Sequence, residues 1–323
     1  MKITIPDDYQ QAIEKLDCFA LLKGQDVKIL HETEKDPRKL AKLLHDTEIL
    51  VLTRERTAIS NELLSLLPHL KLISQTGKIS NHLDLESCTR HGIAVAEGIG
   101  SPVAPAELAW ALLMNTVRKI PQAIEAMKQG KWQINIGSAV YGKTIGIWGY
   151  GKIGKRMAQY AKAFGAEILV WGSENSRNEA LKDGFQAAES KSFFFKNADI
   201  VTLHLRLTEQ TQGIVKEEDL MSMKENACLI NTARAELIEP GALLRVLKSG
   251  KQLFAGLDVY EEEPVTDPGF ELLNMENVIC TPHLGYVEKA GYELYFGKAF
   301  ENVIHFINGN PVNITNPEVL RQK

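Results

Sequence analysis

The sequence contains few cysteines, no strong excess of one charge and no long apolar run. Its four cysteines, among 323 residues, show no C-x-x-C spacing, so they indicate reduced thiols in a cytoplasmic protein rather than a disulfide framework or a zinc site. Lysine and arginine number 37 against 41 acidic residues, and a net charge of −4 gives no reason to expect nucleic acid or an acidic membrane as a partner.

The chain also lacks the pattern of a targeting or membrane segment. The first ten residues, MKITIPDDYQ, carry acidic groups where a signal peptide has its apolar core. The most apolar helical stretch begins at Ala104, is too short to span a bilayer and contains Glu107. The sequence therefore predicts a cytoplasmic protein without a membrane partner, and no spacing typical of metal ligands is present.

What the sequence does have is a repeated alternation of strand-like and helix-like segments, which is typical of an α/β fold. Its length is enough for two domains. A helix with Ser60 as its N-cap should end at Pro68, residues 102–129 favour a long helical segment broken near Pro121, and a last helix is expected at about 287–308. Strands are predicted at KITI, VKILHE, EILVLT, LKLISQTG and IAVAEG, and then at TIGIWG, EILVWG, DIVTLHL, ACLINTAR, FAGLDVY and VICTPHLG.

A glycine-rich turn follows the strand that begins at Thr144. In Gly149-x-Gly151-x-x-Gly154 the first glycine permits a tight turn, the second a close approach of the backbone to a pyrophosphate, and the third close packing of helix on strand. The pyrophosphate would lie at the helix N-terminus, where free N–H groups and the dipole favour negative charge. A purely structural turn is the competing interpretation, but the strand–helix–strand order favours a dinucleotide.

The tip of the next strand lacks the acidic residue that commonly holds the ribose 2′-hydroxyl of NAD. The strand ends at Gly172 and is followed by Ser173, with Glu174 only after that. Ser173, Ser176 and Arg177 could accommodate a 2′-phosphate, which favours NADP over NAD. The alternative is that this stretch, SENSR, is a solvent-exposed loop that holds no ligand.

Polar side chains follow three later strands. They are Arg234, then Asp258 with Glu263, and then His283. Because the carboxyl ends of parallel strands meet at one edge of a sheet, these residues could serve one site. Arginine binds a carboxylate through two hydrogen bonds, and a carboxylate beside a histidine favours the protonated ring of a general acid. Any one of these residues alone is more often structural or exposed. The prediction therefore depends on their occurrence together, in this order, after successive strands.

Together these stretches resemble the D-isomer-specific 2-hydroxyacid dehydrogenases. The similarity covers nearly the whole chain and rests on YGKTIGIWGYGKIG, ADIVTLHLRLTEQTQGIV, ACLINTARAELIE, GLDVYEEEP and NVICTPHLG, with LTRERTAIS, TGKISNHLDLESCTRHGIAV and PAELAWALLMNTVRKIP nearer the N-terminus. It implies an α/β protein of two doubly wound, Rossmann-like domains with parallel sheets. A cofactor domain, residues 101–290, would be inserted into a discontinuous substrate domain formed by residues 1–100 and 291–323.

The resemblance also implies roles for individual residues. Arg234 would bind the substrate carboxylate and polarise the 2-oxo group, His283 would exchange a proton with its oxygen, Glu263 would pair with His283, and Asp258 would face the nicotinamide carboxamide. The backbone at Gly77, Lys78 and Ile79 would help to hold the substrate carboxylate. The cofactor-binding set comprises Gly149, Gly151, Lys152, Ile153, Gly154, Gly172, Ser173, His204, Arg206, Thr232, Ala233, Asp258 and Gly285. No metal is implied.

Some positions depart from the family pattern. Arg206 replaces a proline near the adenine and could reach a cofactor phosphate, stack on the adenine or lie in solvent. Ala235 stands where glycine is common after the arginine. Lys78 and Ile79 replace small residues, so the isoleucine is expected to narrow the pocket and the lysine to add an anion-binding charge.

The substrate and the activity have alternatives. Arg54 and Arg56 resemble an arginine pair beside the substrate phosphate of phosphoglycerate dehydrogenases, which makes 3-phosphoglycerate and phosphohydroxypyruvate the leading substrate prediction. Hydroxypyruvate or glyoxylate reduction is the alternative, and a non-catalytic NAD(H)-sensing protein is another. A formate dehydrogenase is disfavoured, because such enzymes have Gln-Pro where Glu263 and Pro264 stand here. A homodimer formed through the cofactor domain is also implied.

Overall fold

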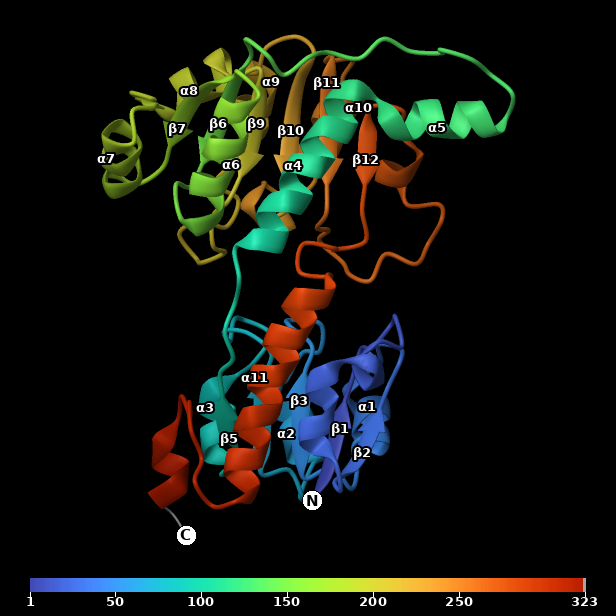
Figure 1. The fold of residues 1–323 in the computed structure, drawn as a ribbon, viewed down its shortest axis with the longest axis vertical. Coiled ribbons are helices and arrows are strands. Elements are labelled where there is room, and N and C mark those ends of the chain that lie inside the picture. Colours follow the sequence, from blue (N-terminus) through green and yellow to red (C-terminus); the bar gives the residue numbers. More distant parts are fainter. Residues whose placement is uncertain (322–323) are drawn as a thin grey trace. The chain divides into compact units, whose positions relative to one another are not determined.

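The structure, a computed structural model, describes residues 1–321 and divides into two compact units. Unit 1 comprises Met1–Ser101 and Glu288–Lys323, and unit 2 comprises Pro102–Val287. Both units contain an entirely parallel sheet with helices packed on it, which confirms the predicted fold class (Figure 1). Unit 1 is built from two separate stretches of the chain, so its last helix joins a sheet made by the first hundred residues.

Unit 1 contains a five-stranded sheet in the order β2-β1-β3-β4-β5. In this order the chain reverses its direction of sheet growth between β1 and β3, which is the place where open α/β sheets bind ligands. Its elements are β1 (Lys2–Ile5), η1 (Ile13–Lys15), η2 (Asp17–Leu22), β2 (Asp26–Ile29), α1 (Pro37–Leu43), β3 (Ile49–Leu52), α2 (Asn61–Ser65), β4 (Leu72–Gln75), α3 (Leu85–Arg90), β5 (Ala94–Ala96), α11 (Lys289–Ile307) and η5 (Pro317–Arg321).

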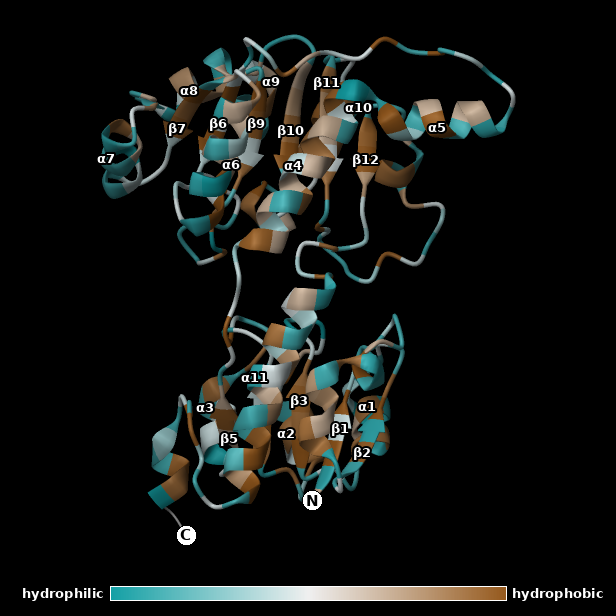
Figure 2. Cartoon of the chain, viewed as in Figure 1, coloured by the Kyte–Doolittle hydropathy of each residue, from teal (hydrophilic) through white to brown (hydrophobic). Residues whose placement is uncertain are grey.

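Both faces of the unit 1 sheet are covered by apolar side chains. Helices α1 to α3 supply one core, in which Leu40, Leu63 and Cys88 pack against the buried strands. Helix α11 packs against β3, β4 and η2, and the Ser74 hydroxyl donates to the carbonyl of Ala299 at 2.9 Å. Figure 2 shows the strands as the most hydrophobic part of this unit. Buried strands of branched residues explain why the sequence pattern identified this sheet.

Unit 2 contains a seven-stranded sheet in the order β12-β11-β10-β9-β6-β7-β8. Its reversal point lies between β6 and β9. The elements are α4 (Val103–Arg118), α5 (Ile120–Lys128), β6 (Thr144–Trp148), α6 (Lys152–Ala163), β7 (Glu167–Trp171), α7 (Glu174–Lys182), β8 (Gln186–Ala187), α8 (Lys191–Asn197), β9 (Ile200–Leu203), α9 (Glu217–Ser222), β10 (Ala227–Asn231), η3 (Ala235–Leu237), α10 (Ala242–Lys248), β11 (Leu253–Leu257), η4 (Glu271–Asn274) and β12 (Val278–Cys280).

Alternate residues of the unit 2 strands enter two separate cores. On β10, Leu229 packs with Phe194 of α8, whereas Cys228 and Ile230 pack with Met157 of α6 on the opposite face. Helix α4 covers β10 and β11 on that second face (Figure 1). A sheet buried on both sides leaves its polar strand ends as the place for chemistry.

The secondary structure agrees with the sequence in most places and differs in two. Ser60 caps α2, and the expected break near Pro121 falls at Lys119, whose left-handed backbone (φ 54°) separates α4 from α5. The stretch SENSR is not the loop of the alternative interpretation, because α7 begins within it and Ser173 is the N-cap. The short strand β8 was not predicted, since two residues are too few to show a pattern.

Candidate active site

The glycine turn after β6 is closely packed. A β-carbon at Gly154 would stand 2.1 Å from the carbonyl oxygen of Gly149, and Gly149 itself has φ +100°. Both residues must therefore be glycine for α6 to begin directly against the end of β6. The amide of Gly149 donates to Trp171 at 3.0 Å, which joins the turn to the tip of β7.

The first turn of α6 is open toward the space beyond Gly151. A β-carbon at Gly151 would meet no atom within 4 Å, and no side chain among the described residues caps the helix at this position. The amides of Lys152 and Ile153 at the start of the helix are therefore not satisfied by a capping group. Orphan amides and a helix dipole suit the pyrophosphate of a dinucleotide.

A cation from α7, rather than a carboxylate, lies at the end of β7. The guanidinium of Arg177 lies over the ring of Trp171, 5.0 Å from its centroid. Its Nε is buried and has no hydrogen-bond partner among residues 1–321. The hydroxyl of Ser173 accepts a hydrogen bond from the amide of Ser176 at 3.3 Å. A half-buried guanidinium with an unused donor is suited to an anionic group.

The end of β9 carries His204, whose ring nitrogen Nε2 lies 2.9 Å from the hydroxyl oxygen of Thr202. Burial lowers the pKa of His204 to about 4, so the ring is neutral near pH 7. Its amide donates to the carbonyl of Trp148 at 2.8 Å, which keeps the ends of β9 and β6 in register. Arg206 is exposed, and its carbonyl accepts a hydrogen bond from Thr211.

The loop after β10 is held by the buried side chain of Asn231. Its Nδ2 donates to the carbonyl of Arg234 at 2.9 Å, and its Oδ1 accepts from the amide of Ala233 at 3.1 Å. Arg234 Nη1 also donates to the carbonyl of Ala233 at 2.5 Å. Thr232, Ala233 and Arg234 are all partly exposed. A short, clamped loop thus presents the predicted arginine at the carboxyl end of the sheet.

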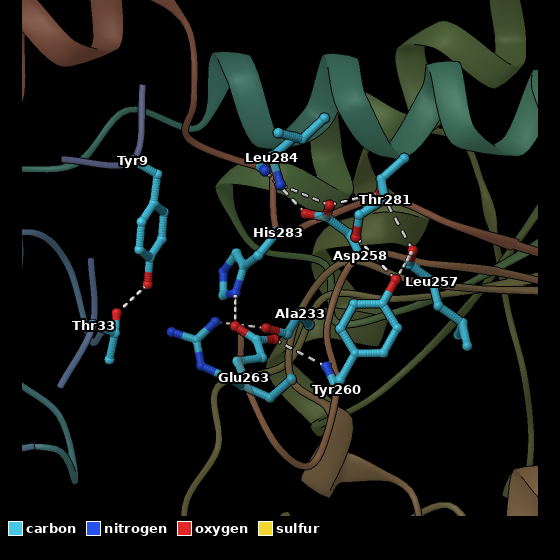
Figure 3. A network of polar contacts seen from close by, with 12 residues as sticks. Tyr9, Thr33, Ala233, Leu257, Asp258, Tyr260, Glu263, Thr281, His283 and Leu284 are labelled. Carbon is cyan, nitrogen blue, oxygen red and sulfur yellow. Dashed lines mark hydrogen bonds and ion pairs between the residues drawn. The ribbon is translucent and has the colours of Figure 1, made fainter. Parts of the chain in front are cut away.

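His283 and Glu263 form a hydrogen-bonded pair in unit 2 (Figure 3). His283 Nδ1 lies 2.6 Å from Glu263 Oε2, and the side chains are 29% and 31% exposed. The other carboxylate oxygen of Glu263 accepts from the amide of Tyr260 at 3.0 Å. A carboxylate at Nδ1 fixes the ring so that Nε2 is the nitrogen left for a substrate.

The electrostatics of this pair favour an ionised Glu263. Burial raises the pKa of its carboxyl group, but the hydrogen bond and charge of His283, the Tyr260 amide and the charge of Arg234 lower it further. The net effect places the pKa of Glu263 below its ordinary value. Arg234, Glu263 and His283, predicted from three separate strand ends, are therefore close enough to interact.

Asp258 anchors the loop that carries His283. Its side chain is fully buried, and its carboxylate accepts hydrogen bonds from the Thr281 hydroxyl at 2.7 Å and from the amides of Leu284 and Gly285 at 2.7 and 2.9 Å (Figure 3). These contacts flank His283, whose backbone is in the left-handed region with φ 52°. In this structure Asp258 thus binds its own chain; its predicted contact with the nicotinamide stays a prediction.

The remaining predicted site residues belong to unit 1. A β-carbon at Gly77 would stand 2.0 Å from Nη1 of Arg54, so the guanidinium lies directly on the loop that follows β4. Arg54 has φ 54°, and its amide and carbonyl are bound by Thr76 and Gln75. A strained residue held by two neighbours is typical of a functional position.

Glu97 changes what was expected of Lys78 and Ile79 in the loop after β4. Its carboxylate forms an ion pair with Lys78 at 2.5 Å and accepts from the amide of Ile79 at 3.0 Å. The charge expected from Lys78 is thus compensated, and the Ile79 amide is engaged within the protein. Gly77, the third position predicted to help to hold the substrate carboxylate, lies against the guanidinium of Arg54.

Comparison with known proteins identifies the family. The sequence model described as D-isomer specific 2-hydroxyacid dehydrogenase, NAD binding domain, matches residues 110–285. The chain belongs to this family. It is therefore an oxidoreductase that acts on the CH–OH group of 2-hydroxy acids with a nicotinamide cofactor.

Relatives of this dehydrogenase carry several names. Glyoxylate reductase of Thermococcus kodakarensis is 34% identical over 92% of this chain and 91% of its own length. The structure of a phosphoglycerate oxidoreductase from Vibrio cholerae is 50% identical, covers 96% of this chain and 99% of the other, and superposes with a TM-score of 0.94. A D-3-phosphoglycerate dehydrogenase of Methanocaldococcus jannaschii is 36% identical over 80% of this chain, which spans only 51% of that relative.

Two features of the dehydrogenase could not be predicted from its sequence. The hydrogen bonds of Asp258 join it to residues 23 to 27 positions away in the sequence, and no sequence motif predicts them. Arg56 was grouped with Arg54, but its Nη1 donates to the carbonyl of Asp7 at 2.8 Å and its guanidinium lies over the Tyr9 ring at 4.4 Å. The two arginines thus have different surroundings.

Proposed function

We propose that this dehydrogenase reduces a small 2-oxo acid to the D-2-hydroxy acid, with His283 as the proton donor. The observation that carries the proposal is the short contact between His283 and Glu263 beside Arg234. The nicotinamide supplies the hydride when it is bound. Transfer of a hydride to a carbonyl carbon leaves negative charge on the oxygen, and a protonated imidazole and a guanidinium stabilise that charge.

Each residue of the group has a separate task. Glu263 accepts a hydrogen bond from the Nδ1–H group of His283 and so keeps the Nε2–H group of the imidazolium directed at the substrate oxygen. Arg234 binds the substrate carboxylate, and Asp258 keeps the His283 loop in place. The open first turn of α6 would hold the pyrophosphate. In this assignment unit 2 binds the cofactor and also supplies Arg234 and His283 for the reaction.

NADP is the preferred cofactor in this proposal. The carboxyl end of β7 has no carboxylate to hold a ribose 2′-hydroxyl, and the guanidinium of Arg177 lies over Trp171 at that end. Guanidinium groups recognise phosphate through charge-assisted hydrogen bonds. Ser173 and Ser176 stand at the start of the same helix.

Two substrates have support. Phosphohydroxypyruvate, the counterpart of 3-phosphoglycerate, is favoured by the guanidinium of Arg54 at Gly77 and by the name of the Vibrio cholerae relative. Hydroxypyruvate is favoured because the guanidinium of Arg56 contacts the Asp7 carbonyl and the Tyr9 ring. Of the two arginines, Arg54 is then the one whose guanidinium lies against the loop after β4, which would hold the substrate. A single guanidinium suits a smaller, less charged acid.

The enzyme is also proposed to be a homodimer that associates through unit 2. The segment from α5 to β6 carries large apolar side chains in solvent. The most exposed are Met127 at 64%, Trp132 at 75%, Ile136 at 91% and Tyr141 at 80%. Exposed apolar groups gathered on one segment are typical of an interface. Within residues 1–321, no helix is both long and apolar enough to cross a bilayer.

The proposal is tested by following the absorbance of NADPH or NADH with glyoxylate, pyruvate, hydroxypyruvate and phosphohydroxypyruvate. His283→Ala should lower kcat by about 10²–10⁴ while NADPH still binds, because general acid catalysis contributes that range. Arg234→Ala should lower kcat/KM for every substrate. Turnover by His283→Ala at the wild-type rate would assign the proton to another group.

A further inference from the structure

Tyr260 lies in the first of the two loops that carry Glu263 and His283. Strand β11 ends at Leu257, three residues before Tyr260 and six before Glu263. Strand β12 ends three residues before His283. The distance between the paired side chains therefore depends on how two separate loops are held. The Tyr260 ring is buried and packs edge-on against Phe270, with 5.8 Å between the centroids.

Tyr260 contacts both loops, one through its backbone and the other through its hydroxyl (Figure 3). Its amide donates to Oε1 of Glu263 at 3.0 Å. Its hydroxyl forms hydrogen bonds with the carbonyl of Leu257 at 3.2 Å and with that of Thr281 at 2.9 Å. A phenol has a single proton, so these two carbonyls share it. The hydroxyl therefore joins the end of β11 to the residue that follows β12.

The carbonyl of Thr281 is also the group that holds the backbone of His283. It accepts from the His283 amide at 2.9 Å, where the His283 backbone is left-handed. Asp258 binds different atoms of the same loop, the Thr281 hydroxyl and the amide of the residue after His283. Tyr260 differs from Asp258 because its amide also binds Glu263, so it contacts both sides of the catalytic pair.

We propose that Tyr260 is a positioning residue that sets the distance between Glu263 and the His283 ring, acting through the Thr281 carbonyl. The inference rests on the proposed role of His283 as the proton donor. Without the hydroxyl, the Thr281 carbonyl still binds the His283 amide and the ring at position 260 still packs, so the loop loosens without unfolding. A carboxylate farther from Nδ1 favours the protonated ring less and orients it less well.

Other titratable groups of unit 2 lie near the Tyr260 hydroxyl or act on the pair. They are Arg234, Asp258, Cys280 and Tyr286. Burial raises the pKa of the Cys280 thiol, so this group is neutral near pH 7. Tyr260→Phe removes no charge from this surrounding. A change in the pH dependence of the variant therefore reports the contact between Glu263 and His283.

The test compares Tyr260→Phe with wild type in the reduction of glyoxylate and hydroxypyruvate by NADPH or NADH. kcat should fall about three- to tenfold, the value of one neutral hydrogen bond, with little change in KM. The pH above which kcat/KM declines should be lower by about half a unit, which corresponds to the loss of part of one hydrogen bond. The proton NMR signal of the His283 Nδ1–H group, assigned by its loss in His283→Ala, should move upfield as this hydrogen bond lengthens.

Thr116→Val is the matched control, because it removes a buried hydroxyl of unit 2 that donates to the carbonyl of Leu112 at 2.8 Å within α4. It should leave the pH dependence and the NMR signal as in wild type, and an equal shift in this variant would overturn the inference. If Tyr260→Phe lowered only the melting temperature, Tyr260 would be structural, and His283 would remain the proton donor. Full turnover by His283→Ala would overturn the proposed function and the inference together.

Discussion

The guanidinium of Arg54 occupies the space in which a side chain at Gly77 would begin, with Nη1 only 2.0 Å from the position of a β-carbon. The loop after β4 and the loop after β3 therefore depend on each other. Arg54 can hold its position only while residue 77 is glycine.

Gly77→Ala should displace the Arg54 side chain without unfolding unit 1, because the clash involves the mobile end of a long side chain. KM for 2-oxo acids should rise about tenfold, roughly the value of one charge-assisted hydrogen bond. Steady-state kinetics and thermal melts check this. Gly100→Ala is the control, since a β-carbon there meets no atom within 4 Å and the backbone is not left-handed. Unchanged KM in Gly77→Ala would remove Arg54 from the substrate site.

Arg177→Ala should weaken NADPH binding about ten- to a hundredfold and change NADH binding little, because only NADPH has a 2′-phosphate to lose its guanidinium partner. Fluorescence titration of both cofactors provides the measurement. Arg206→Ala is the comparison, because Arg206 is exposed and has three competing interpretations. A loss of NADPH affinity in that variant alone would move the phosphate site to the loop after β9.

Replacement of Glu263 should have a pH-dependent effect on stability. The folded-state pKa of Glu263 is below its unfolded value, so its contribution is present above about pH 4.3 and is lost as the pH falls through the folded pKa. Glu263→Gln should thus lower the free energy of unfolding more at pH 7 than at pH 3. Urea unfolding at the two pH values measures the difference. An equal loss at both would mean that packing, not charge, is responsible.

The lowered pKa of His204 predicts a second effect of pH on stability. Its cause is different, because burial disfavours the charged form of His204, whereas hydrogen bonds and nearby charges favour the charged form of Glu263. The folded pKa of His204, about 4, lies below the ordinary value of about 6.5, because burial disfavours the charged ring. The unfolded chain therefore takes up the proton first, and stability should fall as the pH drops from about 6.5 to about 4. His204→Gln should flatten the stability curve over this window. A wild-type curve already flat between these values would contradict the neutral buried ring.

Ile136→Asp should convert a dimer into monomers, because a carboxylate would be buried in the proposed apolar interface. Light scattering with size-exclusion chromatography reports the mass directly. Leu181→Asp, at a 57% exposed position on α7, is the matched control. If the wild-type protein were already a monomer, the proposed dimer interface at the apolar segment between α5 and β6 would be wrong.

The sequence was sufficient for the parts of the molecule that depend on local pattern. Runs of branched residues predicted both parallel sheets, and the glycine spacing predicted the turn against α6. The strand ends predicted that Glu263 and His283 could serve one site, and the resemblance then implied that these two residues pair. The pairing of Lys78 with Glu97 and the anchoring by Asp258 depend on which loops meet in space, and no periodicity encodes that.

The division of unit 1 into two stretches has a consequence for how the protein is made. The last strand of its sheet, β5, is completed by Asn316, which accepts from the amide of Val95 and donates to the carbonyl of Ile93, and Ser74 on β4 needs the carbonyl of Ala299. During synthesis these partners emerge from the ribosome more than 200 residues after the strands with which they form hydrogen bonds. Unit 2 has all of its chain once Val287 has emerged. The first-made sheet is therefore the last to be finished, and its exposed edge must be kept from other nascent chains until synthesis ends.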